Sequence, residues 1–293
     1  MSKRHTARIG VVSLFAAIGL IAAACAPPAA PPAQTWEVSA TKVVNVDSQD
    51  EIRDPVFGWC IAIPNCNDEP YVINIGTRVK IGVPNSASGF VKTSRDNNPE
   101  DVPEGETRNL SGDAGAPAVF TGVRPLDVGD LLNTNNKLEV VVVYSWVMEE
   151  DLVAVNTAAN DVKDILVDAL NSTLAAGSLP NDAEDLVDLI LNNLGSAFTL
   201  LLSNIPLLGL GDDVGGGALH VGIGAKGALA GIVDTAIGAA TIPSFDIPIL
   251  DLPPDIKHVN IFSMAGTSTF TGQRFDQYGD GIHDYDFRAT PLS

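Results

Sequence analysis

The sequence predicts a mixed α+β fold, in which mainly antiparallel sheets form a β-sandwich and carry an inserted helical hairpin. Apolar residues alternate with polar ones in the first and last parts of the chain, whereas they recur every three or four positions in the middle. Strands followed by helices and then by further strands are the order expected of a sandwich with a helical insertion. An open α+β sheet is the alternative.

The first strands are predicted from a period of two. In the first of them, the apolar face is expected to contain Trp36, Val38, Ala40, Val44 and Val46. A second strand is predicted over residues 71–81. A third is predicted over 138–148, where nearly every position is apolar, as in a strand covered on both faces. Residues 85–115 are rich in Gly, Pro, Asn, Ser and acids, so we expect a long loop there.

Residues 151–203 are predicted to form a helical hairpin that packs on the core. One apolar stripe consists of Leu152, Val155, Ala159, Val162, Leu166 and Leu170, and a second consists of Leu186, Ile190, Leu194, Phe198 and Leu201. Asn181 or Asp182 can cap the second helix. Residues 177–180 separate the two helices.

The C-terminal part is predicted to return to strands. Residues 206–217 are expected to be a loop, and 218–240 a short strand followed by a helix from about Lys226. Residues 242–255 contain four prolines and are expected to be an extended connector. Short strands are predicted at 258–264, 268–274 and 284–290. Residues 36–293 are therefore predicted to be one α+β domain with a helical insertion at about 151–240.

The N-terminus has the pattern of a secretory signal peptide. A basic segment precedes the uncharged residues 9–24, which are marginal in length for a membrane span. Ile21-Ala22-Ala23-Ala24-Cys25 resembles the lipobox of bacterial lipoproteins. The resemblance implies that residues 1–24 are removed and that Cys25 becomes the lipidated first residue. Ala22-x-Ala24 would also suit an ordinary signal peptidase, which would leave a secreted protein.

The resemblance implies that the protein lies at the extracytoplasmic face of the cell membrane or envelope. Its membrane partner would be bound through the N-terminal lipid, which includes a palmitate-type acyl chain. Residues 25–35 would then hold the lipidated Cys and a Pro- and Ala-rich tether, which proline keeps extended. The resemblance covers the N-terminus alone and implies nothing about the fold.

Two further cysteines, Cys60 and Cys66, flank a Pro-Asn turn. In an oxidising compartment they are expected to form a local disulfide, and a reduced, buried pair is the alternative. No His or further Cys lies nearby with the ligand spacing of a zinc site.

The charge of the mature chain restricts its partners. Residues 1–24 carry three basic residues and no acid, so their removal changes the formal net charge from −19 to −22. A surface of this sign repels phosphate backbones, which argues against nucleic acid as a partner. A divalent cation or a basic partner fits the charge better, and the sequence does not identify a protein partner.

The motifs of common enzymes are missing from the sequence. No Gly-x-Ser-x-Gly elbow and no phosphate-binding loop are present. Gly222-x-Gly224-x-x-Gly227 matches a dinucleotide fingerprint as a string. However, the strand predicted before it is short, and no second parallel unit is evident from the sequence.

Acids gather in the predicted turns, which suggests a cation site. Ca²⁺ is bound by six to eight oxygens, often from loop carboxylates. The candidate ligands are Asp47, Asp50, Asp68, Asp276 and Asp280. Asp is common in turns whether or not a metal is bound, so solvated turns are the alternative.

Three classes of function are compatible with these patterns. The leading one is a non-catalytic binding or structural module of the cell envelope. The second is a carrier of an apolar ligand held between the helical hairpin and the sheet. The third is an envelope hydrolase that uses carboxylates or a metal, for which the sequence offers no nucleophile. The chain is thus not expected to be an enzyme.

Overall fold

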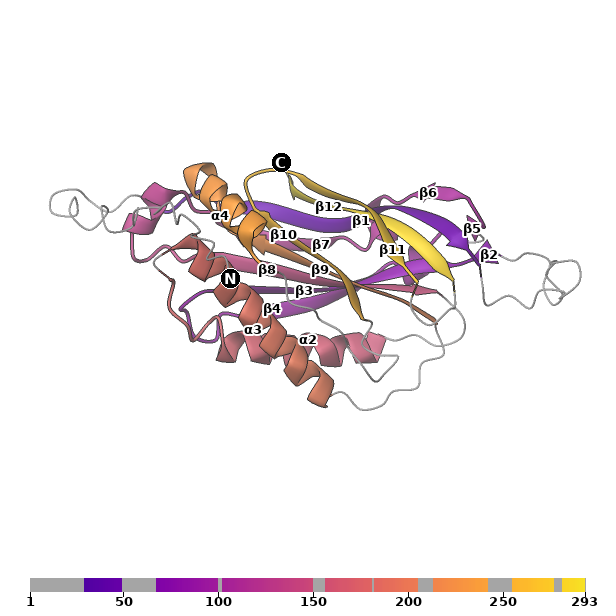
Figure 1. Cartoon of the computed structure of the whole chain (residues 1–293), viewed down its shortest axis with the longest axis horizontal. Coiled ribbons are helices and arrows are strands. Elements are labelled where there is room, and N and C mark those ends of the chain that lie inside the picture. Colours follow the sequence, from indigo (N-terminus) through magenta and orange to yellow (C-terminus); the bar gives the residue numbers. More distant parts are fainter. Residues whose placement is uncertain are drawn as a thin grey trace, which may run out of the picture.

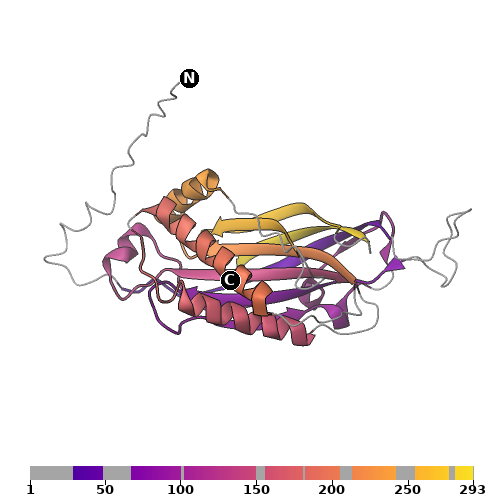
Figure 2. The ribbon, with the colours of Figure 1, turned by 60° about the horizontal axis from the view of Figure 1, so that its bottom comes forward.

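The computed structural model describes residues 29–48, 67–99, 102–149, 156–180, 182–204, 213–241, 255–276 and 281–292. Two five-stranded sheets face each other, and helices cover the outer face of the second sheet (Figures 1 and 2). The predicted sheet-rich α+β fold with an inserted helical hairpin is therefore confirmed. Among the described residues, no helix has the length and apolar character needed to cross a membrane.

The first sheet contains both ends of the described chain. Its order is β11-β12-β1-β6, and β7 also pairs with β1. The strands are β1 (Gln34–Asp47), β6 (Thr107–Asn109), β7 (Ala118–Val123), β11 (Ser268–Phe275) and β12 (Ile282–Leu292). All pairs within this sheet are antiparallel.

The apolar face predicted for β1 is wrong beyond Ala40, because the strand contains a β-bulge there. Trp36, Val38 and Ala40 are buried as expected, but the pairing with β12 shifts between Ala40 and Lys42. Because one extra residue reverses the side-chain alternation, Val43 and Asn45 become fully buried in place of Val44 and Val46. Asn45 is buried with its amide donating 2.8 Å hydrogen bonds to the Ser48 hydroxyl and to the Val102 carbonyl.

The second sheet has the order β10-β9-β8-β3-β4 and lies between the first sheet and the helices. Its strands are β3 (Pro70–Lys80), β4 (Ser88–Thr93), β8 (Glu139–Glu149), β9 (Asp213–Ile223) and β10 (Ile256–Ser263). Every residue of β8 is buried, which confirms a strand covered on both faces. Val140 and Val142 pack toward the helices, while Val141 and Val143 pack toward the first sheet.

Three helices build the third layer: α2 (Asn156–Ser172), α3 (Ala183–Asn204) and α4 (Gly227–Ala239). The described residues of both predicted stripes are buried in one cluster with the second sheet. Asp182 accepts a 2.8 Å hydrogen bond from the Asp185 amide, as predicted for a cap of the second helix. Leu152, Val155, Asn181 and the side chains of Phe198 and Leu201 lie outside the described part.

Two stretches predicted as loops contain regular structure. Residues 85–115 include β4, β6, the short β5 (Val102–Pro103) and the 3-10 turns Arg95–Asn97 and Gly112–Gly115. β5 pairs with β2 (Asn67–Asp68).

The second stretch is part of β9, which begins at Asp213, within residues expected to be a loop, and contains several glycines. An added Cβ at Gly222 would lie 2.7 Å from Val141 and 2.9 Å from Phe262, which explains why side chains are missing there.

Candidate functional site

A buried acid–histidine cluster, composed of Asp68, Glu149, His283 and Tyr285, lies at the end of the sandwich where β1 stops and β12 starts. Asp68 and Tyr285 are fully buried, and His283 is 3% exposed. The His283 Nε2 atom lies 2.9 Å from the Asp68 Oδ2 atom. These two atoms are close enough for an ion pair but are not aligned as a hydrogen bond. The contact joins β12 of the first sheet to the short β2–β5 pair.

The second carboxylate of the cluster comes from the opposite sheet. Glu149 is the last residue of β8 and is 5% exposed. An added Cβ at Gly281 would lie 3.2 Å from His283 Cε1, 3.3 Å from Asp68 Oδ2 and 3.6 Å from Glu149 Oε2. Gly281 has a φ of +128°, which also disfavours other residues. The absence of a side chain at position 281 therefore leaves room for the three groups to approach one point.

The charges of the cluster act on Tyr285. Burial raises the pKa of the Tyr285 hydroxyl well above its usual value, and the nearby charges of Glu149 and Asp68 raise it further. The phenol is thus neutral at any physiological pH. Neither its oxygen nor the Asp68 Oδ1 atom has a hydrogen-bond partner among the described residues. Buried polar atoms without partners are unusual and mark a position where a water or another small polar group fits.

The structure brings some of the predicted cation ligands to this end and leaves others apart. Asp47 lies opposite Ile282 in the β1–β12 pairing, and Asp68 contacts His283. Asp276 directly follows β11, and its carboxylate lies 3.9 Å from the Lys257 ammonium. Asp50 and Asp280 are outside the described residues. Among the residues described, no three His, Cys, Asp or Glu side chains are grouped so that they hold a metal ion. Cys25, Cys60 and Cys66 also lie outside this part of the chain.

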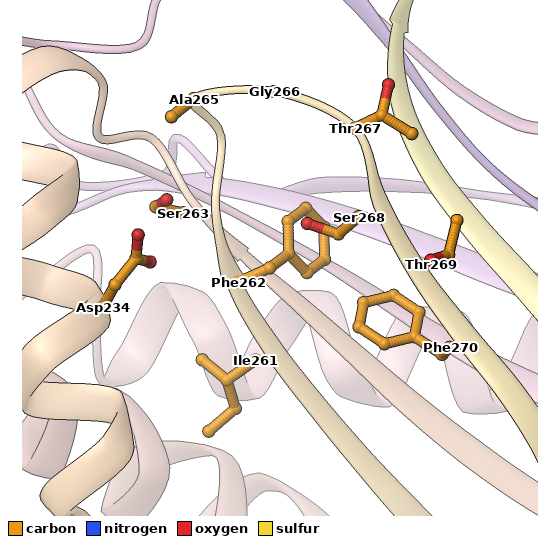
Figure 3. Close-up of a pocket in the computed structure, with 10 residues that line it drawn as sticks. All are labelled: Asp234, Ile261, Phe262, Ser263, Ala265, Gly266, Thr267, Ser268, Thr269 and Phe270. Carbon is orange, nitrogen blue, oxygen red and sulfur yellow. The ribbon is translucent and has the colours of Figure 1, made fainter.

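A second site, which we name the α4 groove, lies toward the other end of the sandwich, where Figure 1 shows α4, and it is drawn in close-up in Figure 3. It lies between α4 and the turn that joins β10 to β11, and its volume is about 500 Å³. The lining consists of Asp234, Ile261, Phe262, Ser263, Ala265, Gly266, Thr267, Ser268, Thr269 and Phe270. Among the described residues, the lining therefore combines one carboxylate and four hydroxyl groups with two aromatic rings and has no cationic side chain.

Side-chain hydrogen bonds fix the walls of the α4 groove. β10 and β11 are edge strands of different sheets, and the amides of Asn260 and Gln273 bond to each other across the seam at 2.7 and 3.3 Å. The Asn260 amide also donates to His220 Nδ1 at 3.1 Å. Burial lowers the pKa of His220 to about 3, with a smaller contribution from His258, so the ring is neutral and its Nδ1 atom can accept.

The glycine string in β9 does lead into a βαβ unit, because β10 runs parallel to β9 after α4. β9 has 11 residues, which corrects the expectation that the strand before the string is short. However, the N-terminus of α4 already has an anionic partner. Asp127 Oδ1 accepts from the Val128 amide at 2.7 Å and the Ala228 amide at 3.0 Å, and these donors lower the pKa of Asp127. A carboxylate at this place would repel a bound phosphate, so the unit does not have the chemistry of a dinucleotide site.

Apart from Asp68, the sequence pattern did not single out the residues that build these two sites. Glu149 ends an apolar run, and His283, Tyr285 and Phe287 alternate along β12 on its buried face. Such alternation of His and Tyr with Phe was the available signal for a buried polar cluster. Asp234 and Ser268 carried no signal, because the α4 groove depends on how a helix sits beside a hairpin. Comparisons of the chain with models of protein families, with curated proteins and with solved structures gave no match.

Proposed function

We propose that the chain is an exported protein, held by a lipid on Cys25 at the extracytoplasmic face of the cell membrane or envelope, and that it acts there as a non-catalytic binding or structural module. The alternative for its address is secretion without a lipid, after cleavage by an ordinary signal peptidase. Its leading site for a partner is the α4 groove.

The position of β1 is the observation that supports this proposal best. The strand begins at Gln34, directly after the Pro- and Ala-rich segment, and Thr35 pairs with Leu292. β1 is paired on both edges, with β12 on one side and with β6 and β7 on the other. An anchor attached to a strand that is held on both sides would orient the whole sandwich. Fourteen residues of strand extend about 45 Å, so the acid–histidine cluster would lie far from the membrane.

The α4 groove lies at the end of the sandwich that would face the anchor. The Thr267 hydroxyl in the β10–β11 turn bonds to the Thr290 hydroxyl of β12 at 2.7 Å. Thr290 pairs with Glu37, only a few residues after the start of β1. A partner in the groove would thus be bound close to the membrane surface.

Neither rival function gains support from the packing. A carrier would need space between the hairpin and the second sheet, yet Leu166, Leu170 and Leu194 are buried there against the strands. An apolar ligand would have to displace these core side chains. A hydrolase could use the acid–histidine cluster, but its four side chains are at most 5% exposed. A substrate would need a large rearrangement to reach them.

The proposal is tested by mass spectrometry of the N-terminal peptide, after expression of the full chain in a bacterium that processes lipoproteins. We expect a peptide that begins at Cys25 and carries acyl chains. Cys25→Ser should move the protein from the membrane fraction to the soluble fraction, whereas the control Cys66→Ser should leave it in the membrane. An unmodified Cys25, or a mature chain that starts elsewhere, would overturn the anchor.

Export is tested separately by the state of the other two cysteines. In an oxidising compartment, Cys60 and Cys66 should be linked by a disulfide that closes a short loop, which stabilises the fold by about 2 kcal/mol in the chain-entropy model. Peptide mapping without reductant should recover the two peptides joined. Two free thiols in protein isolated from the envelope would contradict this expectation.

A further inference from the structure

The lining of the α4 groove restricts what it can bind. Asp234 is exposed on α4, and its carboxylate forms no ion pair with the described residues. The described residues of the lining include no Lys, Arg or His, so none of them can neutralise a phosphate, a sulfate or a carboxylate ligand. The groove therefore excludes anionic ligands and offers hydrogen-bond acceptors and hydroxyl groups instead.

The apolar part of the groove consists of Ile261, Phe262, Ala265 and Phe270, and Phe270 is the more accessible of its two rings. Phe262 and Phe270 come from the two strands that flank the turn, and their ring centroids are 5.8 Å apart with planes tilted by 51°. Figure 3 shows both rings between the strands, with Ser268 beside them and Asp234 facing from α4. Phe262 is 5% exposed and packs near Trp36, whereas Phe270 is half-buried. The groove thus places an apolar surface beside hydroxyl groups and a carboxylate.

The polar wall is held in place before any ligand binds. The Met264 amide donates to the Ile223 carbonyl at 2.9 Å, which attaches the start of the turn to β9. Thr267 attaches its other end to β12 through Thr290. Asn260 and Gln273 close the seam below the rings. A site whose walls are fixed in this way loses little conformational entropy when it binds.

From this geometry we propose that the α4 groove binds a neutral saccharide. A pyranose ring has an apolar face of C–H groups and a rim of hydroxyl groups, which matches the half-buried ring of Phe270 and the oxygens around it. The Asp234 carboxylate accepts hydrogen bonds from two neighbouring sugar hydroxyls, while the hydroxyl of Ser268 donates or accepts at the rim. The volume of about 500 Å³ is within the usual range for small-molecule sites. This inference rests on the proposed binding module and names the class of its ligand.

The test is ligand-observed saturation-transfer NMR, followed by calorimetry, on the mature full chain in detergent. The probes are glucose, galactose, mannose, arabinose, N-acetylglucosamine and their disaccharides. We expect saturable binding of at least one probe, with a dissociation constant of about 1 mM or tighter and little dependence on salt. Asp234→Asn and Ser268→Ala should each weaken it by about tenfold. The control Asp161→Asn, an exposed acid on α2, should have no effect.

Three results would overturn the saccharide assignment. The first is that no probe shows saturable binding at 20 mM, which is about twenty times the expected dissociation constant. The second is that binding is unchanged in both groove variants. The third is that a lysine-terminated peptide binds in preference to the sugars and that this binding is lost at high salt. The folding of each variant is checked by its melting temperature. Lipidation of Cys25 is measured on the same preparations, so that the two proposals are tested separately. A lipidated protein that binds no saccharide would contradict the saccharide assignment and leave the lipid anchor in place. An unlipidated protein that binds a saccharide would contradict only the lipid anchor.

Discussion

The imidazole of His283 lies 2.9 Å from the carboxylate of Asp68, and both side chains are almost completely excluded from solvent. Removing one partner of a buried pair leaves the other group charged and unpaired, at a cost of about 3–5 kcal/mol. We therefore expect His283→Leu to lower the free energy of unfolding by about 3 kcal/mol or more in urea titrations. Asp276→Asn, at an exposed acid at the same end, should change it by no more than about 0.5 kcal/mol.

The double variant Asp68→Leu/His283→Leu separates the pair from simple packing effects. Because it removes both polar groups together, it should recover part of the stability lost in His283→Leu. Equal losses in His283→Leu and in the Asp276→Asn control would show that the contact with Asp68 is energetically unimportant.

His220 should make the protein less stable in acid. Burial lowers the pKa of His220 to about 3 in the folded protein, while the unfolded chain has the ordinary value of 6.5. Below pH 6.5 the unfolded chain therefore binds the extra proton, and the free energy of unfolding decreases as the pH falls toward 3. Two pH units correspond to about 3 kcal/mol for this group, so the loss should be large by pH 4.5.

The measurement is the slope of unfolding free energy against pH, between pH 7 and 4.5. His220→Gln should flatten the slope, whatever its effect on stability at pH 7, whereas His258→Gln should leave it close to that of the unsubstituted protein. Titration of the His220 ring near pH 6 in NMR spectra of the folded protein would be inconsistent with its buried, neutral state.

Gly227 is expected to resist substitution more strongly than a glycine of the same backbone conformation elsewhere. Gly227 and Gly112 have φ values of +57° and +56°, but an added Cβ meets no atom within 4 Å at Gly112 and lies 2.2 Å from Asp127 Oδ2 at Gly227. Gly112→Ala should cost about 1 kcal/mol, the penalty of a left-handed backbone alone. Gly227→Ala should cost clearly more, because it also displaces the carboxylate that caps α4.

Urea unfolding followed by circular dichroism compares the two alanine variants directly. If they are equally stable, the contact of Asp127 with the start of α4 does not contribute to the fold. Asp127→Asn should weaken the same cap without a steric clash and therefore fall between Gly227→Ala and the unsubstituted protein.

Calcium binding remains a prediction for the acidic turns near the start of β12. We expect Ca²⁺ to raise the melting temperature of the protein by a few degrees at constant ionic strength, compared with EDTA. Asp280→Asn should abolish the shift, while Asp161→Asn on α2 should retain it. Identical melting temperatures in Ca²⁺, Mg²⁺ and EDTA would mean that Asp47, Asp68 and Asp276 are balanced by neighbouring groups, as Asp68 and Asp276 already are in part by His283 and Lys257.

The sequence predicted those features that depend on local periodicity. The double-sided burial of β8 and the stripes of α2 and α3 follow from one strand or helix and its pattern of apolar residues. The bulge after Ala40 did not follow, because it depends on the register with β12 at the far end of the chain. Both candidate sites likewise depend on contacts between segments that are distant in sequence. Glu149 and His283 approach each other only once the two sheets are stacked, and Asp234 faces Ser263 only once α4 lies beside the β10–β11 turn.

The pairing of β1 with β12 joins the first and the last strands of the described chain along most of their length. Contacts between residues so distant in sequence form slowly, because a long loop must close before they are made. A chain that emerges from a ribosome or a membrane pore with its N-terminus first therefore has no partner for that edge of β1 until β12 appears. The first sheet can therefore be completed only after β12 has been delivered. Loss of even the last strand would leave a central strand with an open edge, a surface prone to aggregation.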